Sequence, residues 1–362
     1  MKIKVSAKNM NDKLSKLSRL FIKSKIDDYT SKIRICARDS YFDLYVVNDD
    51  ISVYDRIYEC YSDCNFSFLF DAATLISFFK SKKGDIDIVL SDDYSAKFFY
   101  RNGEFEYVWE DDSKFPEIFK PSGSKIRLRS SYFVPVLKRC FSFLANDEFR
   151  ESINRVLIKN NNGYIDVVAT DRFKLFKSTK ESYSPDNMEF LISEKCASLL
   201  YQYISDDDVD LYMSTDNKRT FIEFGDTFVS DMGTEMKYPN YSLLFDKFMP
   251  TTSFDVEKSS LLSSLESSAI ANTTNFDIVI SNNLTITALN ILDRKKVKES
   301  IGVLNINGQE DKMCVSSKNI IASVKNIIGD SIRFEYSNKN RLIRMYNPKY
   351  NSESILCSTL VI

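Results

Sequence analysis

Three stretches of the chain share one pattern of hydrophobic and polar positions: an apolar strand, a small polar residue, and then an amphipathic helix. They read FLFDAATLISFFK at 68–80, FLISEKCASLLYQ at 190–202 and MCVSSKNIIASVK at 313–325. Asp71, Ser193 and Ser316 precede the three helices, where a side-chain oxygen can accept hydrogen bonds from unpaired backbone amides. The pattern therefore predicts three equivalent helices, each with its own N-cap.

The spacing between these stretches is nearly constant, at 122 and 123 residues between the N-cap positions. Earlier in each copy an alternating strand leads into another helical stretch, and these strands begin at Lys2, Lys125 and Ser253. Leucines recur at matching positions of those helical stretches, namely Leu14, Leu137 and Leu265. Pro116 and Pro239 are also 123 residues apart. A fixed period of this kind indicates internal repetition.

We therefore expect three copies of one unit, forming domains at 1–121, 122–250 and 251–362. Segments such as KIRICA, RTFIEF and RLIRMY alternate with near period two and are rich in isoleucine and aromatic residues, so they predict strands. The expected fold class is α+β, with two helices packed on antiparallel sheets in each domain. Polar stretches around 122–124 and 250–252 are the predicted linkers.

Length and composition agree with this organisation. A chain of 362 residues suits two or three domains, and its 43% hydrophobic and 28% charged residues are typical of soluble globular proteins. No apolar run approaches the roughly 18 residues that a membrane-spanning helix needs. The N-terminal segment lacks the apolar core of a secretory signal. We therefore expect a cytoplasmic protein with no membrane partner.

The sequence offers little to build a catalytic centre. It contains no histidine, which removes the Ser-His and Cys-His nucleophile pairs and the commonest general base. Only nine glycines are present, and none forms a phosphate-binding loop. Of seven scattered cysteines, only Cys60 and Cys64 are close, and there is no second pair to complete a zinc site. We expect no enzymatic activity, no metal and no cofactor.

One segment, VVATDRFKLF at 167–176, raises a question of its own. Two valines read as a buried strand and Thr170-Asp171 as a turn, but large apolar and basic residues follow directly. Either a second strand begins there, or the turn presents a surface on which a partner docks, and both can hold at once.

The triple repeat, the Ala-Thr-Asp turn, the Tyr-Pro-Asn-Tyr segment at 238–241 and the apolar C-terminus together resemble the bacterial sliding clamp, the beta subunit of DNA polymerase III. The resemblance covers the whole chain in order. It implies that two chains close head to tail into a homodimeric ring around duplex DNA, with helices lining the hole. Such a ring is a processivity factor of DNA replication: it performs no chemistry and tethers the polymerase.

The resemblance also implies a hydrophobic pocket between the second and third domains that receives short apolar peptides from DNA polymerase and clamp-loader subunits. Carried over by motif, this pocket contains Ile153, Thr170, Arg172, Phe173, Lys174, Leu175, Pro239, Leu243, Leu244, Leu356, Ser358 and Leu360. Arg172 stands where the family usually has glycine, and Ser358 departs from the family's usual C-terminus, so we expect a narrower and more polar pocket. The alternative is that Phe173, Leu175 and Phe176 form only a buried strand.

Basic residues on the predicted helices are candidates to face DNA without sequence specificity: Lys13, Lys16, Lys80, Lys138, Arg139 and Lys195. The alternative is that they form ordinary solvated helix faces. The third repeat is less basic, since Glu266 stands where the second repeat has Lys138. Tyr107 and Ile270 are the candidates for the dimer interface. Trp109, near Tyr107, reads equally well as a core aromatic.

A second function remains open. The altered pocket and the weakly basic third repeat also fit a diverged clamp relative that docks or sequesters partners without encircling DNA. Ring formation and loading onto circular DNA distinguish these two functions.

Overall fold

The computed structural model describes residues 1–21, 29–118, 123–184, 186–204, 208–216, 218–350 and 352–360. Within these ranges the same order of elements occurs three times: strand, helix, several strands, helix, several strands. None of the described helices is long and apolar enough to cross a membrane. Nor do the described residues contain a cluster of three or more His, Cys, Asp or Glu able to hold a metal ion.

The first repeat consists of β1 (Lys2–Ser6), α1 (Ala7–Leu17), β2 (Lys32–Ala37), β3 (Tyr41–Val47), β4 (Ile51–Tyr58), β5 (Cys60–Ser62), β6 (Phe66–Asp71), α2 (Ala72–Lys80), β7 (Asp85–Leu90), β8 (Ser95–Tyr100) and β9 (Gly103–Val108). The second consists of β10 (Ile126–Arg129), α3 (Ser130–Cys140), β11 (Arg155–Asn161), β12 (Tyr164–Thr170), β13 (Lys174–Glu181), β14 (Met188–Ser193), α4 (Glu194–Tyr203), β15 (Asp210–Thr215), β16 (Arg219–Phe224) and β17 (Thr227–Met232), and is followed by the short α5 (Ser242–Asp246).

The third repeat consists of β18 (Thr252–Glu257), α6 (Lys258–Ala269), β19 (Asn275–Ile280), β20 (Asn283–Asn290), β21 (Lys295–Gly302), β22 (Leu304–Gly308), β23 (Asp311–Ser316), α7 (Ser317–Lys325), β24 (Ser331–Ser337), β25 (Leu342–Tyr346) and β26 (Glu353–Leu360). The predicted α+β class with antiparallel sheets is confirmed.

The helix predictions are confirmed in detail. The Asp71 carboxylate accepts a hydrogen bond from the Thr74 amide at 2.8 Å, and α4 begins directly after Ser193. The Ser316 hydroxyl accepts from the Asn319 amide at 3.5 Å. The three leucines at matching positions of the first helices, Leu14, Leu137 and Leu265, are all fully buried. The repeated pattern therefore marks the residues that anchor each first helix to its core.

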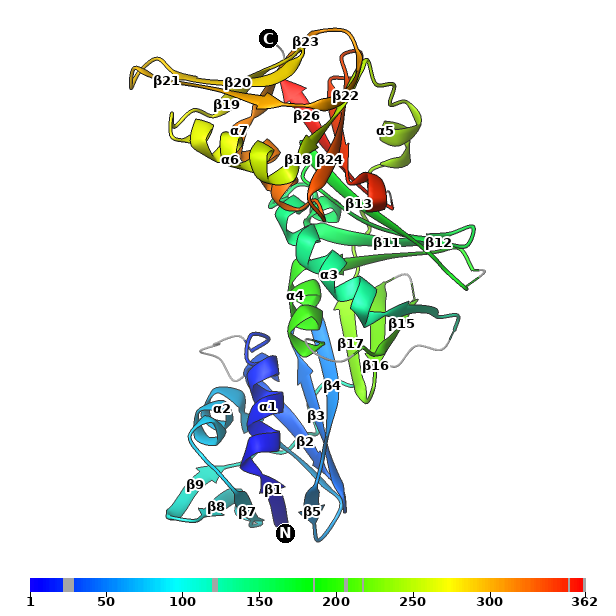
Figure 1. Ribbon diagram of the computed structural model, residues 1–362. Coiled ribbons are helices and arrows are strands. Elements are labelled where there is room, and N and C mark those ends of the chain that lie inside the picture. The colour runs from blue at the N-terminus through cyan, green and yellow to red at the C-terminus, as the bar shows by residue number, and fades with distance from the viewer. Residues whose placement is uncertain are drawn as a thin grey trace. The chain divides into compact units, whose positions relative to one another are not determined.

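The chain forms two compact units, one of residues 1–134 and 195–233 and the other of 135–194 and 234–362. The first unit contains an eight-stranded sheet of order β10-β15-β16-β17-β4-β3-β2-β6 and a five-stranded sheet of order β5-β1-β7-β8-β9. Because β17 pairs with β4, strands of the first two repeats share one sheet. Helices α1 and α2 pack against each other in this unit (Figure 1).

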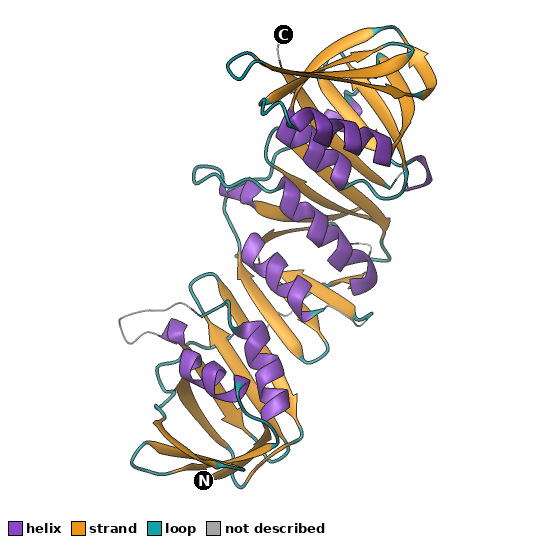
Figure 2. Cartoon of the chain, turned by 60° about the vertical axis from the view of Figure 1, so that its left-hand side comes forward, coloured by secondary structure: helices purple, strands orange, loops and turns teal. Residues whose placement is uncertain are grey.

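The second unit contains one large sheet system along β14-β11-β12-β13-β26-β23-β19-β20-β21, with β18, β22, β24 and β25 attached to it. Strand β26 pairs with β13, β25 and β23, so it joins strands of the second and third repeats. Helices α6 and α7 pack together, α6 over β20 and β21 (Figure 2). The compact units thus divide the second repeat, and the boundary between residues 121 and 122 lies outside the described residues. The three domain boundaries stay a prediction.

Candidate functional site

The turn between β12 and β13 is built by the side chains of its own short sequence. The Asp171 carboxylate accepts hydrogen bonds from the amides of Phe173 and Lys174, at 3.0 and 2.8 Å. The Thr170 hydroxyl donates to the Lys174 carbonyl at 2.9 Å and accepts from the Arg172 amide at 3.1 Å. These local bonds hold a tight turn, as expected for Thr and Asp in this position.

Arg172 has a backbone φ of +81°, in the left-handed region that favours glycine. Its side chain is exposed, with the guanidinium carbon 6.0 Å from the centre of the Phe173 ring. The departure noted in the sequence therefore has a physical consequence. The turn keeps a glycine-type backbone but carries a bulky cation, and the conformation costs about 1 kcal/mol relative to glycine.

A buried apolar cluster lies directly below this turn. It comprises Leu157, Val168, Leu175, Tyr241 and Leu356, and Tyr238 and Phe245 pack against it. Leu175 and Leu356 are register partners on the paired strands β13 and β26. Both are almost fully buried, as is Phe176. The prediction of a second strand after the turn is therefore confirmed for these residues.

The segment around α5 is held against β12 by two tyrosines. The Tyr238 hydroxyl donates to the Val168 carbonyl at 3.4 Å, and the Tyr241 hydroxyl donates to the Asp166 carboxylate at 2.7 Å. Burial, together with the Asp166 carboxylate, raises the pKa of Tyr241 well above its ordinary value, so the phenol stays protonated and keeps donating. Leu243 and Leu244 on α5 are left 46% and 41% exposed.

The predicted pocket residues thus divide into two groups. Ile153, Thr170, Lys174, Leu175 and Leu356 are buried, and the Lys174 ammonium forms an ion pair with Asp171. Arg172, Phe173, Pro239, Leu243 and Leu244 are exposed, while Ser358 and Leu360 are half-buried.

Backbone pairing ties the turn to the C-terminal strand, since the Ser358 amide donates to the Phe173 carbonyl at 2.8 Å. Phe173 itself is 55% exposed, so the buried-strand alternative does not apply to it. We call Phe173, Leu243 and Leu244, with the neighbouring buried cluster, the docking surface, after the role that the resemblance leads us to expect of them.

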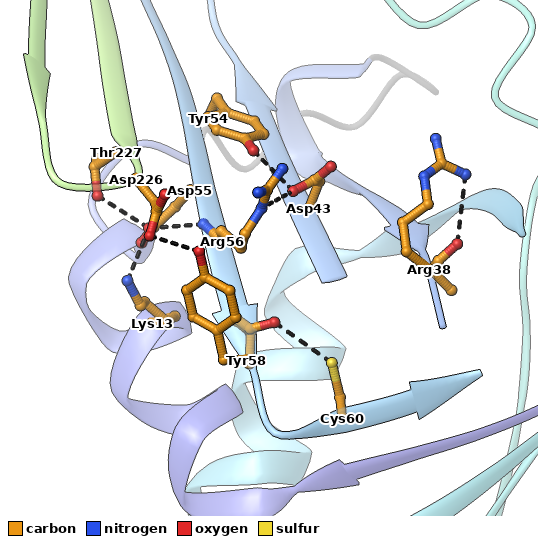
Figure 3. Close-up of polar contacts among 12 residues, drawn as sticks. Lys13, Arg38, Asp43, Tyr54, Asp55, Arg56, Tyr58, Cys60, Asp226 and Thr227 are labelled. Atoms are coloured by element: carbon orange, nitrogen blue, oxygen red, sulfur yellow. Dashed lines mark hydrogen bonds and ion pairs between the residues drawn. The ribbon is translucent and has the colours of Figure 1, made fainter. Parts of the chain in front are cut away.

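Several basic helix residues have their charge engaged within the chain. The Lys13 ammonium lies 2.7 Å from Asp55, a fully buried carboxylate that also accepts from the Thr227 hydroxyl at 3.0 Å (Figure 3). The Lys16 ammonium donates to the Tyr203 carbonyl at 3.3 Å. These partners lie on β4, β17 and α4, far away in the sequence.

Arg139 is the most constrained of the set. Its guanidinium forms a two-pronged ion pair with Glu353, at 2.8 and 2.5 Å, and only 13% of its side chain is exposed. It is therefore a weaker DNA-facing candidate than the sequence suggests. Lys80, Lys138 and Lys195 are exposed, and the Lys195 ammonium lies 3.1 Å from Asp50 in a largely solvated pair.

The first unit also contains an open cavity of about 590 Å³ that the sequence analysis did not predict. It is bordered by α1, the end of β4, the end of α4 and the β16–β17 turn, and Lys13, Lys16, Arg56, Tyr203 and Asp226 are among its lining residues. The Asp226 carboxylate accepts a hydrogen bond from Tyr58 at 2.8 Å (Figure 3). The walls of this cavity come from segments more than 100 residues apart in the sequence, so no local motif could have indicated the cavity.

The structure shows the positions and exposure of the residues predicted for the dimer interface. Tyr107 lies on β9 and is half-buried, with its ring stacked 5.9 Å from that of Phe105. Ile270 follows the end of α6 and is 71% exposed. Trp109 is buried and its indole donates to the Ser91 carbonyl at 3.2 Å, so the interpretation as a core aromatic is confirmed.

No protein-family model and no curated protein matches the sequence. Solved structures do match the fold over its whole length. The DNA polymerase sliding clamp from Bacillus subtilis has a TM-score of 0.93 at 15% identity, covering 100% of this chain and 99% of that one. The beta subunit from DNA polymerase of Streptococcus pyogenes has a TM-score of 0.92 at 14% identity, covering 100% of both chains.

The DNA polymerase III subunit beta from Pseudomonas aeruginosa gives a TM-score of 0.91 at 16% identity, again over 100% of both chains. The match covers the whole chain. It therefore includes the three repeats, the turn between β12 and β13, and strand β26. The chain has the fold of the DNA polymerase III beta subunits, the bacterial sliding clamps, with a strongly diverged sequence.

Proposed function

We propose that this protein is a processivity clamp: a homodimeric ring that encircles duplex DNA and tethers a DNA polymerase and other partners. The observation that carries the proposal is the match to the Bacillus subtilis sliding clamp over the full chain. A match confined to one repeat would support only a related domain. The same order of three repeats is what a ring of six similar domains requires.

The tethering role is assigned to the docking surface. Phe173, Leu243 and Leu244 are exposed, and sequence neighbours of theirs, Leu175, Tyr241 and Phe245, belong to one buried cluster or pack against it. A well-packed base of this kind lets a short extended peptide anchor apolar side chains without reshaping the protein. A sliding clamp from Pseudomonas aeruginosa with this fold has been solved bound to griselimycin, so a protein of this fold does bind a ligand.

The DNA contact is proposed to be weak and independent of sequence. Lys80, Lys138 and Lys195 remain the best candidates, since their side chains are exposed, whereas Lys16 is partly buried and donates to the Tyr203 carbonyl. The chain as a whole carries a net charge of −2, which does not favour tight binding to phosphates. A closed ring needs no tight grip, because topology holds it, and mobile lysines give a salt-sensitive attraction that permits sliding.

The decisive experiment is topological retention. The protein is diluted until it dissociates, reconcentrated with nicked circular DNA, and passed through a sizing column at high salt, which removes electrostatic binding. We expect the protein to stay on the circle and to be lost once a restriction enzyme linearises the DNA. The matched control is the same DNA linearised before assembly.

The proposal would be overturned if the protein forms a closed dimer but separates from circular and linear DNA alike on the column. It would favour the docking relative that binds partners without encircling DNA. Retention on both forms would also contradict it, because the binding would then not be topological.

A further inference from the structure

Two strand pairs join neighbouring repeats of the chain, and we call them seams. In the first seam β4 of the first repeat pairs with β17 of the second, and in the second seam β13 pairs with β26 of the third repeat (Figure 1). Asp55 on β4 is fully buried in the first seam. The Thr227 hydroxyl of β17 donates to the Asp55 carboxylate at 3.0 Å (Figure 3). This hydrogen bond therefore crosses from one repeat to the next.

The second seam has the same two positions with the residue types exchanged. Asp55 and Ser178 are the fifth residues of β4 and β13, while Thr227 and Glu353 are the first residues of β17 and β26. Ser178 and Glu353 are register partners, and the Ser178 hydroxyl donates to the Glu353 carboxylate at 3.4 Å. Each seam thus contains one hydroxyl and one carboxylate, but the carboxylate lies on the earlier repeat in the first seam and on the later repeat in the second.

The first helix of the earlier repeat supplies a cation to each carboxylate. The Lys13 ammonium of α1 lies 2.7 Å from Asp55, and the Arg139 guanidinium of α3 donates to Glu353 at 2.8 and 2.5 Å. The two cations occupy different helix positions, since Lys13 directly precedes the repeated leucine and Arg139 follows it by two residues. Repetition of the sequence alone therefore does not explain these ion pairs, because the position of the cation changes together with the position of the acid.

The third repeat offers a comparison, because its equivalent strand β21 ends its sheet and pairs only with β20 in the described part of the chain. Glu299 is the fifth residue of β21, and the residue two positions after the repeated leucine of α6 is Ser267. The Ser267 hydroxyl donates to the Glu299 carboxylate at 2.7 Å. Where the strand pairs with no further repeat of the chain, the helix thus contributes a hydroxyl in place of a cation.

We propose that the carboxylate, hydroxyl and helix cation of each seam, which we call the seam group, fix the register in which neighbouring repeats pair. Moving β17 by one residue along β4 would separate Thr227 from Asp55 and leave a buried acceptor without this donor, which costs free energy. Buried ion pairs add little net stability over apolar residues, but they can select one arrangement against others. The seam group concerns a single chain and does not depend on a closed ring.

Amide hydrogen exchange of the strands in the first seam tests this proposal, because it reports local opening. Lys13→Val gives α1 the residue that α3 has at the equivalent position, Val136, and leaves the buried Asp55 carboxylate without its cation. We expect exchange in β4 and β17, followed by mass spectrometry, to become about 100-fold faster or more. Peptides of β13 and β26, in the second seam, should be unchanged.

The decisive variant places the second seam group on the first seam. It carries K13V and K16R on α1, D55S on β4 and T227E on β17, so that a cation, a hydroxyl and a carboxylate are present again in the arrangement of the second seam. Exchange in β4 and β17 should return to within about 10-fold of the parent protein.

The matched control is D50N. Asp50 forms an ion pair with Lys195 of the second repeat across the same seam, but both side chains are largely exposed. Exchange in D50N should stay within about twofold of the parent, since solvated pairs contribute little.

The proposal is wrong if exchange in K13V is no faster than in D50N, or if the fourfold variant exchanges as fast as K13V. An equal rise in β7 and β8 would also contradict it, because the ion pair would then stabilise the whole unit and not the seam. If K13V does not fold, D55N replaces it. Its amide can still accept from Thr227 but carries no charge, and exchange in β4 and β17 should become about 10-fold faster; unchanged exchange in D55N would overturn the proposal.

Discussion

The docking surface and the basic helix residues were both predicted from one family resemblance. In the structure they differ in how far their side chains are free to contact a partner. Phe173, Leu243 and Leu244 are exposed and lie close in sequence to residues of one buried cluster, as a binding surface needs. Lys13 and Arg139 instead have their charges engaged by Asp55 and Glu353 within the same chain. The sequence around the Thr170-Asp171 turn predicts the local backbone, because the turn's hydrogen bonds are made within that sequence. A count of basic residues on a helix does not show which of them form ion pairs within the chain.

The largest expected effect is a loss of stability when a residue of the buried cluster in the docking surface is truncated. Leu356→Ala removes a side chain that is 2% exposed, and we expect it to lower the free energy of unfolding by about 2–5 kcal/mol through lost burial and a residual cavity. Urea unfolding followed by circular dichroism measures it. The control is Leu292→Ala, at a residue that is 95% exposed, which should change little. A loss under about 1 kcal/mol would show that the base is not rigid.

The second effect tests whether Arg139 is structural. Arg139→Ala leaves the Glu353 carboxylate, which is only 16% exposed, without its main partner, and should cost about 2–4 kcal/mol of unfolding free energy. Lys195→Ala removes one member of a solvated pair and should cost about 0.5 kcal/mol or less. Equal losses in the two variants would contradict the distinction between engaged and available charges.

The third effect separates binding from stability. Phe173→Ala should weaken binding of a polymerase tail peptide by about 1–2 kcal/mol, because an exposed aromatic anchor is lost, while the free energy of unfolding stays within about 0.5 kcal/mol. Fluorescence anisotropy with a labelled peptide gives the affinity. Tyr183→Ala removes another exposed aromatic and is the matched control. Unaltered affinity would remove Phe173 from the docking surface.

The smallest effect concerns the backbone of the turn. Arg172→Gly relieves a left-handed conformation and should raise the free energy of unfolding by about 0.5–1 kcal/mol. Arg150→Gly is the control, since Arg150 has a φ of −136° and gains nothing from glycine. Thermal unfolding compares the two. A loss of stability in Arg172→Gly would mean that contacts of the arginine side chain outweigh the strain.

Much of the fold could be predicted because the information repeats. Leu14, Leu137 and Leu265 occupy one position in three copies, so each copy supports the others. The turn at Thr170-Asp171 was predictable because its hydrogen bonds are local. The partners of Lys13 and Arg139 were not, since Asp55 and Glu353 lie 42 and 214 residues away.

The pairing of strands from different repeats could not be predicted from the sequence either, because it also depends on contacts between distant segments. Strands β4 and β17 pair with each other in the structure, and nothing in either sequence names the other as its neighbour. The left-handed φ of Arg172 could be suspected only from the family's glycine at that position. Long-range pairing is decided by the whole set of packed elements, not by any one segment.

The place of β26 in the sheet has a consequence for the order of events during synthesis. It is the last described strand along the chain, yet it lies between strands β13, β25 and β23, which are all made earlier. Domains generally fold from the N-terminal side while the ribosome is still at work. Here the second unit cannot close its sheet until residues 353–360 have been made. Until then the β13 edge, next to the docking surface, lacks the partner that β26 provides, and an unpaired strand edge can pair with another chain.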